Sequence, residues 1–249
     1  VFLFFISHAL SSSLERPEST LDDIIKYILT KKEEAMSRAP DFFSKSASIS
    51  EELGHRIKCN DLLGAVFVAI CERDIVALDV LYPYVFEGQN VFVPPASDVE
   101  LVYLLLGQMD NVDHCAYNGD TLLHFAAAYG RLDIVNILLG LKADVNKENM
   151  LGETPFAKAI MSGHVDVLLR LLDKMHDFDK KDRFDNTYLH LAAQFDRLEI
   201  AKILLPSISD IEFRNIHGLT PLDLAIMFNH GDVANLISDE IHNRSQKLH

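Results

Sequence analysis

Apolar residues recur at helical spacing, in pairs of short segments, along the second half of the chain. In residues 118–140, NGDTLLHFAAAYGRLDIVNILLG, one such segment lies on each side of Gly130, which we interpret as the hinge between two short amphipathic helices. A helical hairpin of this size cannot bury its apolar face alone. The sequence therefore predicts that it stacks against further units of the same kind.

The same pattern returns three more times at a fixed interval of 33 residues. Each copy has a threonine in register, namely Thr121, Thr154, Thr187 and Thr220. A fixed period of this length indicates an array of stacked helical units. We expect helix pairs, packed in sequence order, near residues 121–139, 154–172, 187–205 and 220–237.

Local residue types agree with this register. Each threonine is placed to N-cap a first helix, and Pro155 and Pro221 follow at the first helical position, where a missing N–H costs nothing. Two residues before each threonine the backbone is expected to turn with positive φ. The residues at this position are Gly119, Gly152, Asp185 and Gly218.

The four units, GDTLLHFAAAYGRLDIV, GETPFAKAIMSGHVDVL, DNTYLHLAAQFDRLEIA and GLTPLDLAIMFNHGDVA, resemble ankyrin repeats. That family follows a pattern close to G-x-T-P-L-H-x-A-A-x-x-G-H-x-x-V-V-x-L-L, and LKADVNKEN (141–149) is similar to its GADVN hairpin segment. The resemblance covers about residues 116–240. It implies an all-α, ankyrin-type helical solenoid with short β-hairpin-like turns.

The chain departs from the family where second helices end. The expected glycine is replaced by Lys142, Met175 and Ile208 in the first three units, and Pro206 stops the third unit early. We therefore expect these helices to end differently from one another.

Three regions are predicted. Residues 1–58 form an N-terminal α-helical extension, 59–115 divergent or capping repeats, and 116–249 four ankyrin repeats. Within them we expect an amphipathic helix near 20–36, a helix–hinge–helix over 62–82 and a second helix over 99–106. Residues 1–6 are interpreted as an edge packed on the domain, with a signal-peptide remnant as the alternative.

The charge composition argues against some classes of binding partner. The net charge is −14, and neither half of the chain has the basic footprint of a nucleic-acid or membrane-surface binder. The apolar run at the start is too short to cross a bilayer. Three cysteines without a CxxC pair favour reduced thiols and a cytoplasmic location, which would be the host cytosol if the chain is a secreted effector.

Catalytic candidates come from histidines and cysteines, since paired acids such as Glu51 and Glu52 are expected on solvated helix faces. His124 and His190 occupy the family's T-x-x-H position, for which the resemblance implies a structural hydrogen-bonding role. The pairs His114–Cys115 and His55–Cys59 lack an identifiable third, orienting group. We therefore predict no catalytic residue, no metal and no cofactor, and the chain is expected not to be an enzyme.

The predicted function is that of a monomeric scaffold or adaptor that binds a partner protein on its concave surface. Projection of the family pattern places an unusually apolar set of residues there. They are Tyr117, Tyr129, Met150, Leu151, Met161, Arg183, Phe184, Phe195, Ile216, Leu219 and Phe228.

Other hypotheses remain open at this point. Some of these side chains could instead pack against the N-terminal extension, which would make the role structural or autoinhibitory. The array could also recruit substrate for an enzyme, or for a host-directed bacterial effector, whose catalytic part lies in residues 1–58 or outside this chain.

Overall fold

A computed structural model describes residues 25–31, 33, 50–59, 61–85, 102–103, 106–107, 111–175 and 177–247. The chain forms two compact units, residues 1–122 and 123–249. Regular secondary structure in the described residues is helical, with isolated β-bridges at Cys115–Thr121 and Lys181–Thr187, which confirms the all-α prediction. Within the same residues, no helix has both the length and the apolar character needed to cross a bilayer.

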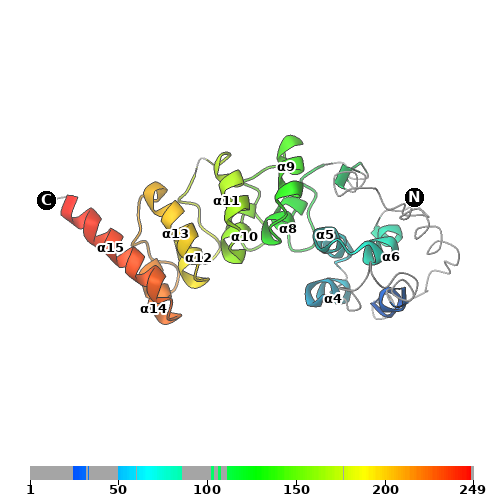
Figure 1. Ribbon diagram of the computed structural model, residues 1–249, viewed down its shortest axis with the longest axis horizontal. Helices are drawn as coiled ribbons and strands as arrows, with labels where there is room; N and C mark the ends of the chain where they lie inside the picture. The colour runs from blue at the N-terminus through cyan, green and yellow to red at the C-terminus, as the bar shows by residue number, and fades with distance from the viewer. Residues whose placement is uncertain are drawn as a thin grey trace. The chain divides into compact units, whose positions relative to one another are not determined.

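The first unit contains the helices α4 (Glu51–Lys58), α5 (Leu62–Glu72) and α6 (Ile75–Val85), drawn in cyan tones in Figure 1. Ser50 caps α4 by accepting a hydrogen bond from the N–H of Leu53 at 3.2 Å. Arg73 separates α5 from α6 in a left-handed conformation, with φ of 59°. The predicted helix–hinge–helix is therefore confirmed.

Other N-terminal predictions fall partly outside the described residues. Residues 25–31 and 33 are helical within the expected 20–36 segment, and residues 102, 103 and 106 are helical within 99–106. The edge expected at residues 1–6 lies entirely outside them.

An ionic cluster connects α4, α5 and the loop before the first matched repeat. Arg56 binds Glu52 and Asp61, each at 2.7 Å, and approaches Asp120 at 3.7 Å. Asp61 also accepts a hydrogen bond from the backbone N–H of Tyr117 at 3.2 Å. Burial acts to lower the pKa of Arg56, but hydrogen bonds to Asp61 and Glu52 outweigh it and the pKa is raised. The cation is thus held in its charged form within the cluster.

The repeats follow as four helix pairs, coloured from green to red in Figure 1. They are α8 (Leu122–Ala128) with α9 (Leu132–Gly140), α10 (Pro155–Ser162) with α11 (Val165–Leu172), α12 (Tyr188–Gln194) with α13 (Leu198–Leu204), and α14 (Pro221–Met227) with α15 (Gly231–Lys247). First helices pack in order, α10 on α12 and α12 on α14, and among second helices α9 packs on α11 and α13 on α15. The predicted stacking order is confirmed.

Residue size explains how the pairs stack. The first helices meet through alanines with no exposed surface, such as Ala126, Ala192 and Ala225, which allow close approach of neighbouring backbones. The second helices contribute larger side chains, including fully buried Leu138 and Leu168. Burial of each such leucine stabilises the fold by about 1.5–3 kcal/mol.

Two of the threonines cap their helices as predicted. Thr154 accepts a hydrogen bond from the N–H of Ala157 at 3.2 Å, and Thr220 accepts one from the N–H of Asp223 at 3.1 Å. The Asp223 carboxylate in turn accepts the Thr220 N–H at 2.9 Å, and these hydrogen bonds lower its pKa. Thr187 forms its capping box with His190: its N–H donates to the ring Nδ1 at 3.1 Å, and its hydroxyl lies 2.8 Å from the same atom.

A second set of side chains satisfies backbone groups of the preceding repeat. His164 lies 3.0 Å from the carbonyl oxygen of Ala128, and Arg197 donates twice to the carbonyl of Met161, at 3.0 and 2.6 Å. His230 Nδ1 lies 2.8 Å from the carbonyl oxygen of Ala193. These carbonyls lie at or near the end of a first helix, where acceptors lack a partner within the helix.

The hinge glycines make room for these donors. Gly130 has φ of 67°, and a Cβ there would come within 2.5 Å of the His164 ring. Gly163 has φ of 85°, and a Cβ there would lie 3.0 Å from the Arg197 guanidinium. Both the backbone conformation and the close approach therefore require glycine.

Second helices end in different ways, as expected. Lys142 adopts the left-handed conformation with φ of 64°, whereas Pro206 lies in a short 3₁₀ turn, Leu205–Ser207, directly after α13. The last helix, α15, is longer, and its Arg244 donates to the carbonyls of Leu205, Ile208 and Ser209 at 2.6–3.2 Å. A guanidinium from the fourth repeat thus satisfies the end of the third.

We expect Gly130→Ala to destabilise the repeat array by about 1–2 kcal/mol or more, because it adds left-handed strain and displaces His164. Gly140 is a matched control, since it lies in α9 and a Cβ there would meet nothing within 4 Å. Gly140→Ala should be neutral or stabilising by up to about 1 kcal/mol. Urea unfolding measures the free energy of unfolding of both variants. Equal effects of the two substitutions would contradict the requirement for glycine at position 130.

Candidate functional site

The tips of three successive hairpins are built in the same way. At the base of each, one side-chain oxygen of Asn149, Asp182 or Asn215 accepts two backbone N–H groups, at 2.8–3.1 Å. At the far side of each tip, Gly152, Asp185 and Gly218 have positive φ, as predicted. The local sequence therefore fixes each tip in one conformation.

Neighbouring tips are joined through their backbones. The N–H of Arg183 donates to the carbonyl of Leu151 at 2.9 Å, and the N–H of Ile216 donates to the carbonyl of Phe184 at 3.1 Å. Residues 32 positions apart therefore lie side by side. We call Met150, Leu151, Arg183, Phe184 and Ile216 the tip row.

The tip row is apolar and open to solvent. Met150 is 52% exposed, Leu151 47%, Phe184 44% and Ile216 55%, and Arg183 is also exposed. Leu219, which sequence reasoning placed with them, is half-buried. Large apolar side chains at adjacent hairpins form the kind of patch that stable monomers seldom expose without a partner.

Other predicted surface residues lie at the ends of first helices. Phe195 and Phe228 follow α12 and α14 as their C-caps and are exposed, whereas Tyr129 and Met161 are half-buried. Tyr117, 79% exposed, belongs to the first unit and has the register of Met150.

At the ends of first helices, two exposed apolar residues were missed by the sequence reasoning. Ile226 is 63% exposed and Met227 57%, next to Phe228 at the end of α14. The positions in register with Ile226, Ala127, Ile160 and Ala193, have no appreciable exposure. In the part of the chain that the structure describes, no further repeat packs on α14, which leaves Ile226 exposed.

His124 and His190 connect repeats and are buried, which agrees with their structural interpretation. His124 Nε2 lies 3.1 Å from the carbonyl oxygen of Glu153, and His190 Nε2 lies 3.1 Å from that of Leu219. His190 Nδ1 accepts the N–H of Thr187, so the ring is neutral with its proton on Nε2. Burial lowers the pKa of His190, which favours this neutral form.

His55 and Cys59 are brought together, with Nε2 and Sγ 3.6 Å apart. Both side chains are exposed, and the nearby carboxylate of Glu52 is bound to Arg56. Within the described part of the chain, no acid orients the imidazole, as an activated cysteine would require. His114 and Cys115 are also exposed, and no hydrogen bond joins their side chains.

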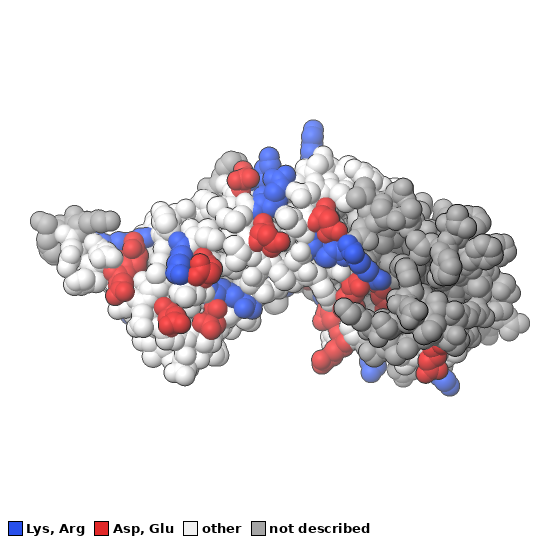
Figure 2. Space-filling model, viewed as in Figure 1, with Lys and Arg blue, Asp and Glu red and all other residues white. Residues whose placement is uncertain are grey.

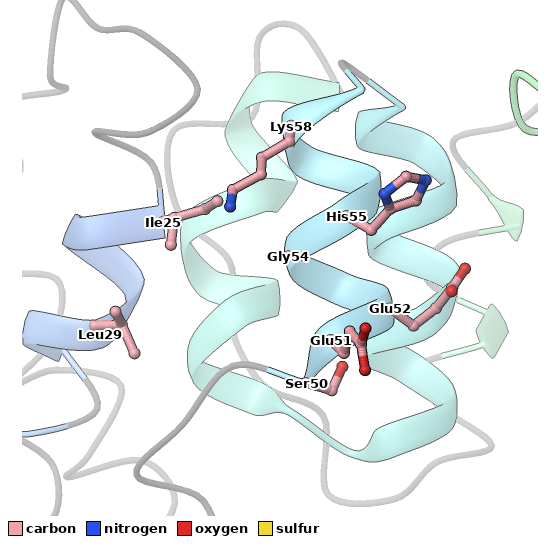
Figure 3. Close-up of a pocket in the computed structure, with 8 residues that line it drawn as sticks. All are labelled: Ile25, Leu29, Ser50, Glu51, Glu52, Gly54, His55 and Lys58. Atoms are coloured by element: carbon pink, nitrogen blue, oxygen red, sulfur yellow. The ribbon is translucent and has the colours of Figure 1, made fainter.

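A cavity of about 810 Å³ lies in the first unit, between the helical residues around Ile25 and Leu29 and helix α4. Figure 3 shows Lys58 reaching toward Ile25, while Ser50 and Glu51 lie at the start of α4. The cavity is lined by both apolar and charged side chains. Among the residues that the structure describes, there is no group of three or more His, Cys, Asp or Glu that could hold a metal ion.

Charges on the repeats are mixed. On the face in Figure 2, Lys and Arg lie beside Asp and Glu in small groups, between larger areas of other residues. The face therefore carries no large patch of a single sign.

Comparison with known families agrees with the geometry. A family model described as ankyrin repeats (3 copies) matches residues 95–182 and 171–247, well over half of the chain. No curated protein matches the sequence.

We expect the pH dependence of stability to include His190. Its pKa is lowered on folding, so its contribution is fully present above the unfolded value near 6.5 and is lost as pH falls below it, toward the folded pKa. Between about pH 7.5 and pH 5.5, wild type should therefore lose more unfolding free energy than His190→Gln, which cannot protonate. Urea unfolding at both pH values tests this, with exposed His217→Gln as control, and equal losses would contradict it.

Exposure predicts a contrast between two phenylalanines of the array. Phe184→Ala should change the unfolding free energy by no more than about 0.5 kcal/mol. Phe156→Ala, at a site with no exposed surface, should cost about 3–5 kcal/mol. A large loss on truncation of Phe184, measured by denaturant unfolding, would show that it belongs to the core.

Proposed function

Because this chain belongs to the ankyrin-repeat family, we propose that it is an adaptor that binds a partner protein through the tip row of its second unit. Ankyrin repeats are protein–protein interaction modules, and the family is typically non-catalytic. The family supplies the scaffold, while the variable side chains at the tips determine which partner is bound.

One observation supports the proposal above the others. Four exposed apolar side chains and one arginine, from three repeats, lie along hairpin tips that hydrogen-bond to one another. Aromatic residues, methionine and arginine are enriched at the centres of protein interfaces. Here about half of each apolar side chain remains in water, and this exposure is a cost unless a partner covers it.

The tips also suit binding because they are already ordered. Each is held by two hydrogen bonds to an Asn or Asp side chain and by a bond to the neighbouring tip. A preorganised surface loses little conformational entropy on association, so more of the contact energy appears as affinity.

Further residues extend the proposed surface. Phe195, Ile226, Met227 and Phe228 are exposed apolar groups at the ends of first helices. We include half-buried Tyr129, Met161 and Leu219 at its edge, and Tyr117 as a contact made by the first unit. Free cysteines at 59, 71 and 115 support a reducing, cytoplasmic setting for a monomeric adaptor.

We expect a double variant, Phe184→Ser with Ile216→Ser, to lose most capture of protein partners from cytosol while it keeps the wild-type melting temperature. The double variant Leu141→Ser with Leu169→Ser is the matched control, since both leucines are exposed but lie in or next to second helices. It should capture the same proteins as wild type. Quantitative mass spectrometry of the captured proteins measures this, and equal capture by all three chains would contradict the proposal.

A further inference from the structure

We propose that the bound segment carries a carboxylate, flanked by apolar side chains, that pairs with Arg183. This inference rests on the proposed function and specifies the chemistry of the partner. It concerns one residue of the tip row whose charge has no match within the described array.

Three cations of the second and third hairpins already have acceptors or rings to bind. Lys180 binds Glu148 at 2.8 Å, and Lys181 lies 3.6 Å from the ring centroid of Phe213. Arg214 donates to the carbonyl of Gly218 at 2.6 Å. These three charges are therefore partly satisfied by the protein itself.

Arg183 differs from them. Its guanidinium is exposed and makes no hydrogen bond or ion pair with any residue that the structure describes. Its backbone is fixed, because its N–H donates to the Leu151 carbonyl and the next residue, Phe184, accepts from Ile216. The backbone thus presents this side chain from a defined place in the middle of the tip row.

The apolar surroundings determine which ligand this cation suits. An ion pair exposed to water contributes little, whereas one shielded by apolar contacts is stronger. Leu151, Phe184 and Ile216 can supply that shielding once apolar side chains of the partner cover them. A planar guanidinium binds a carboxylate through two parallel hydrogen bonds, which adds directional specificity.

Net charge favours a single carboxylate over a polyanion. The chain carries −14 overall, and exposed Asp185 lies two residues from Arg183. Long-range repulsion acts against nucleic acid or a strongly acidic segment. One acidic side chain among apolar ones meets the cation at short range without that penalty.

The test is selection of random peptides displayed on phage against the whole chain, its Arg183→Glu variant and its Lys174→Glu variant. Lys174 is the matched control because it is exposed, follows α11 and undergoes the same change of charge. Wild type and Lys174→Glu should enrich peptides with Asp or Glu between apolar residues. Arg183→Glu should instead enrich Lys or Arg at that position.

Calorimetry on one enriched peptide completes the test. We expect at least about tenfold weaker binding to Arg183→Glu, and a similar loss when the peptide's acidic residue becomes its amide. Arg183→Gln should weaken binding of the acidic peptide, and this loss should not add to that of the amide peptide when the two are combined, as expected for a direct pair.

The remaining outcomes separate the two proposals. Peptides that lack an acidic bias and bind Arg183→Glu as well as wild type, yet fail on Phe184→Ser with Ile216→Ser, would overturn the carboxylate inference alone. Enriched peptides that bind this double variant unchanged, or the absence of any enrichment, would overturn the tip row as a binding surface.

Discussion

Each repeat of this array depends on its neighbour to bury its apolar face and to satisfy its backbone. Alanines between first helices bring the backbones close, and polar side chains then reach across to the free carbonyls. His164, Arg197 and His230 do so at the helix hinges, and His190 does so at a hairpin. A buried carbonyl without such a donor would cost about 1–3 kcal/mol, so these contacts fix both the spacing and the order of the repeats.

The same stacking creates the surface that we propose as functional. Because each hairpin is attached to a stacked helix pair, the tips align and their backbones bond to one another. The fold does not require particular side chains at the tips, so the residue types there can suit a binding partner. Met150, Leu151, Phe184 and Ile216 are apolar without contributing to the core, and Arg183 adds a charge to an otherwise apolar row.

Sequence reasoning predicted what depends on local backbone chemistry. The 33-residue threonine register, the prolines at helix starts and the left-handed turn at Asp185 specify conformations that need no knowledge of neighbours. Sequence reasoning failed where the packing of an adjacent repeat determines whether a residue is exposed. Among the residues that the structure describes, no further repeat packs on α14, so Ile226 is exposed although the same register position is buried in the preceding repeats. The cross-repeat donors recur every 33 residues, a signal that was present but unused.

Recognition by the tip row depends on its being a rigid, preorganised surface rather than a set of flexible loops. Amide hydrogen exchange in the free chain, followed residue by residue by NMR, tests it most directly. The amides of Arg183 and Ile216, which bond to the neighbouring tips, should exchange as slowly as helix amides in α12. Exchange of these two amides at the rate of an unstructured peptide would contradict the account.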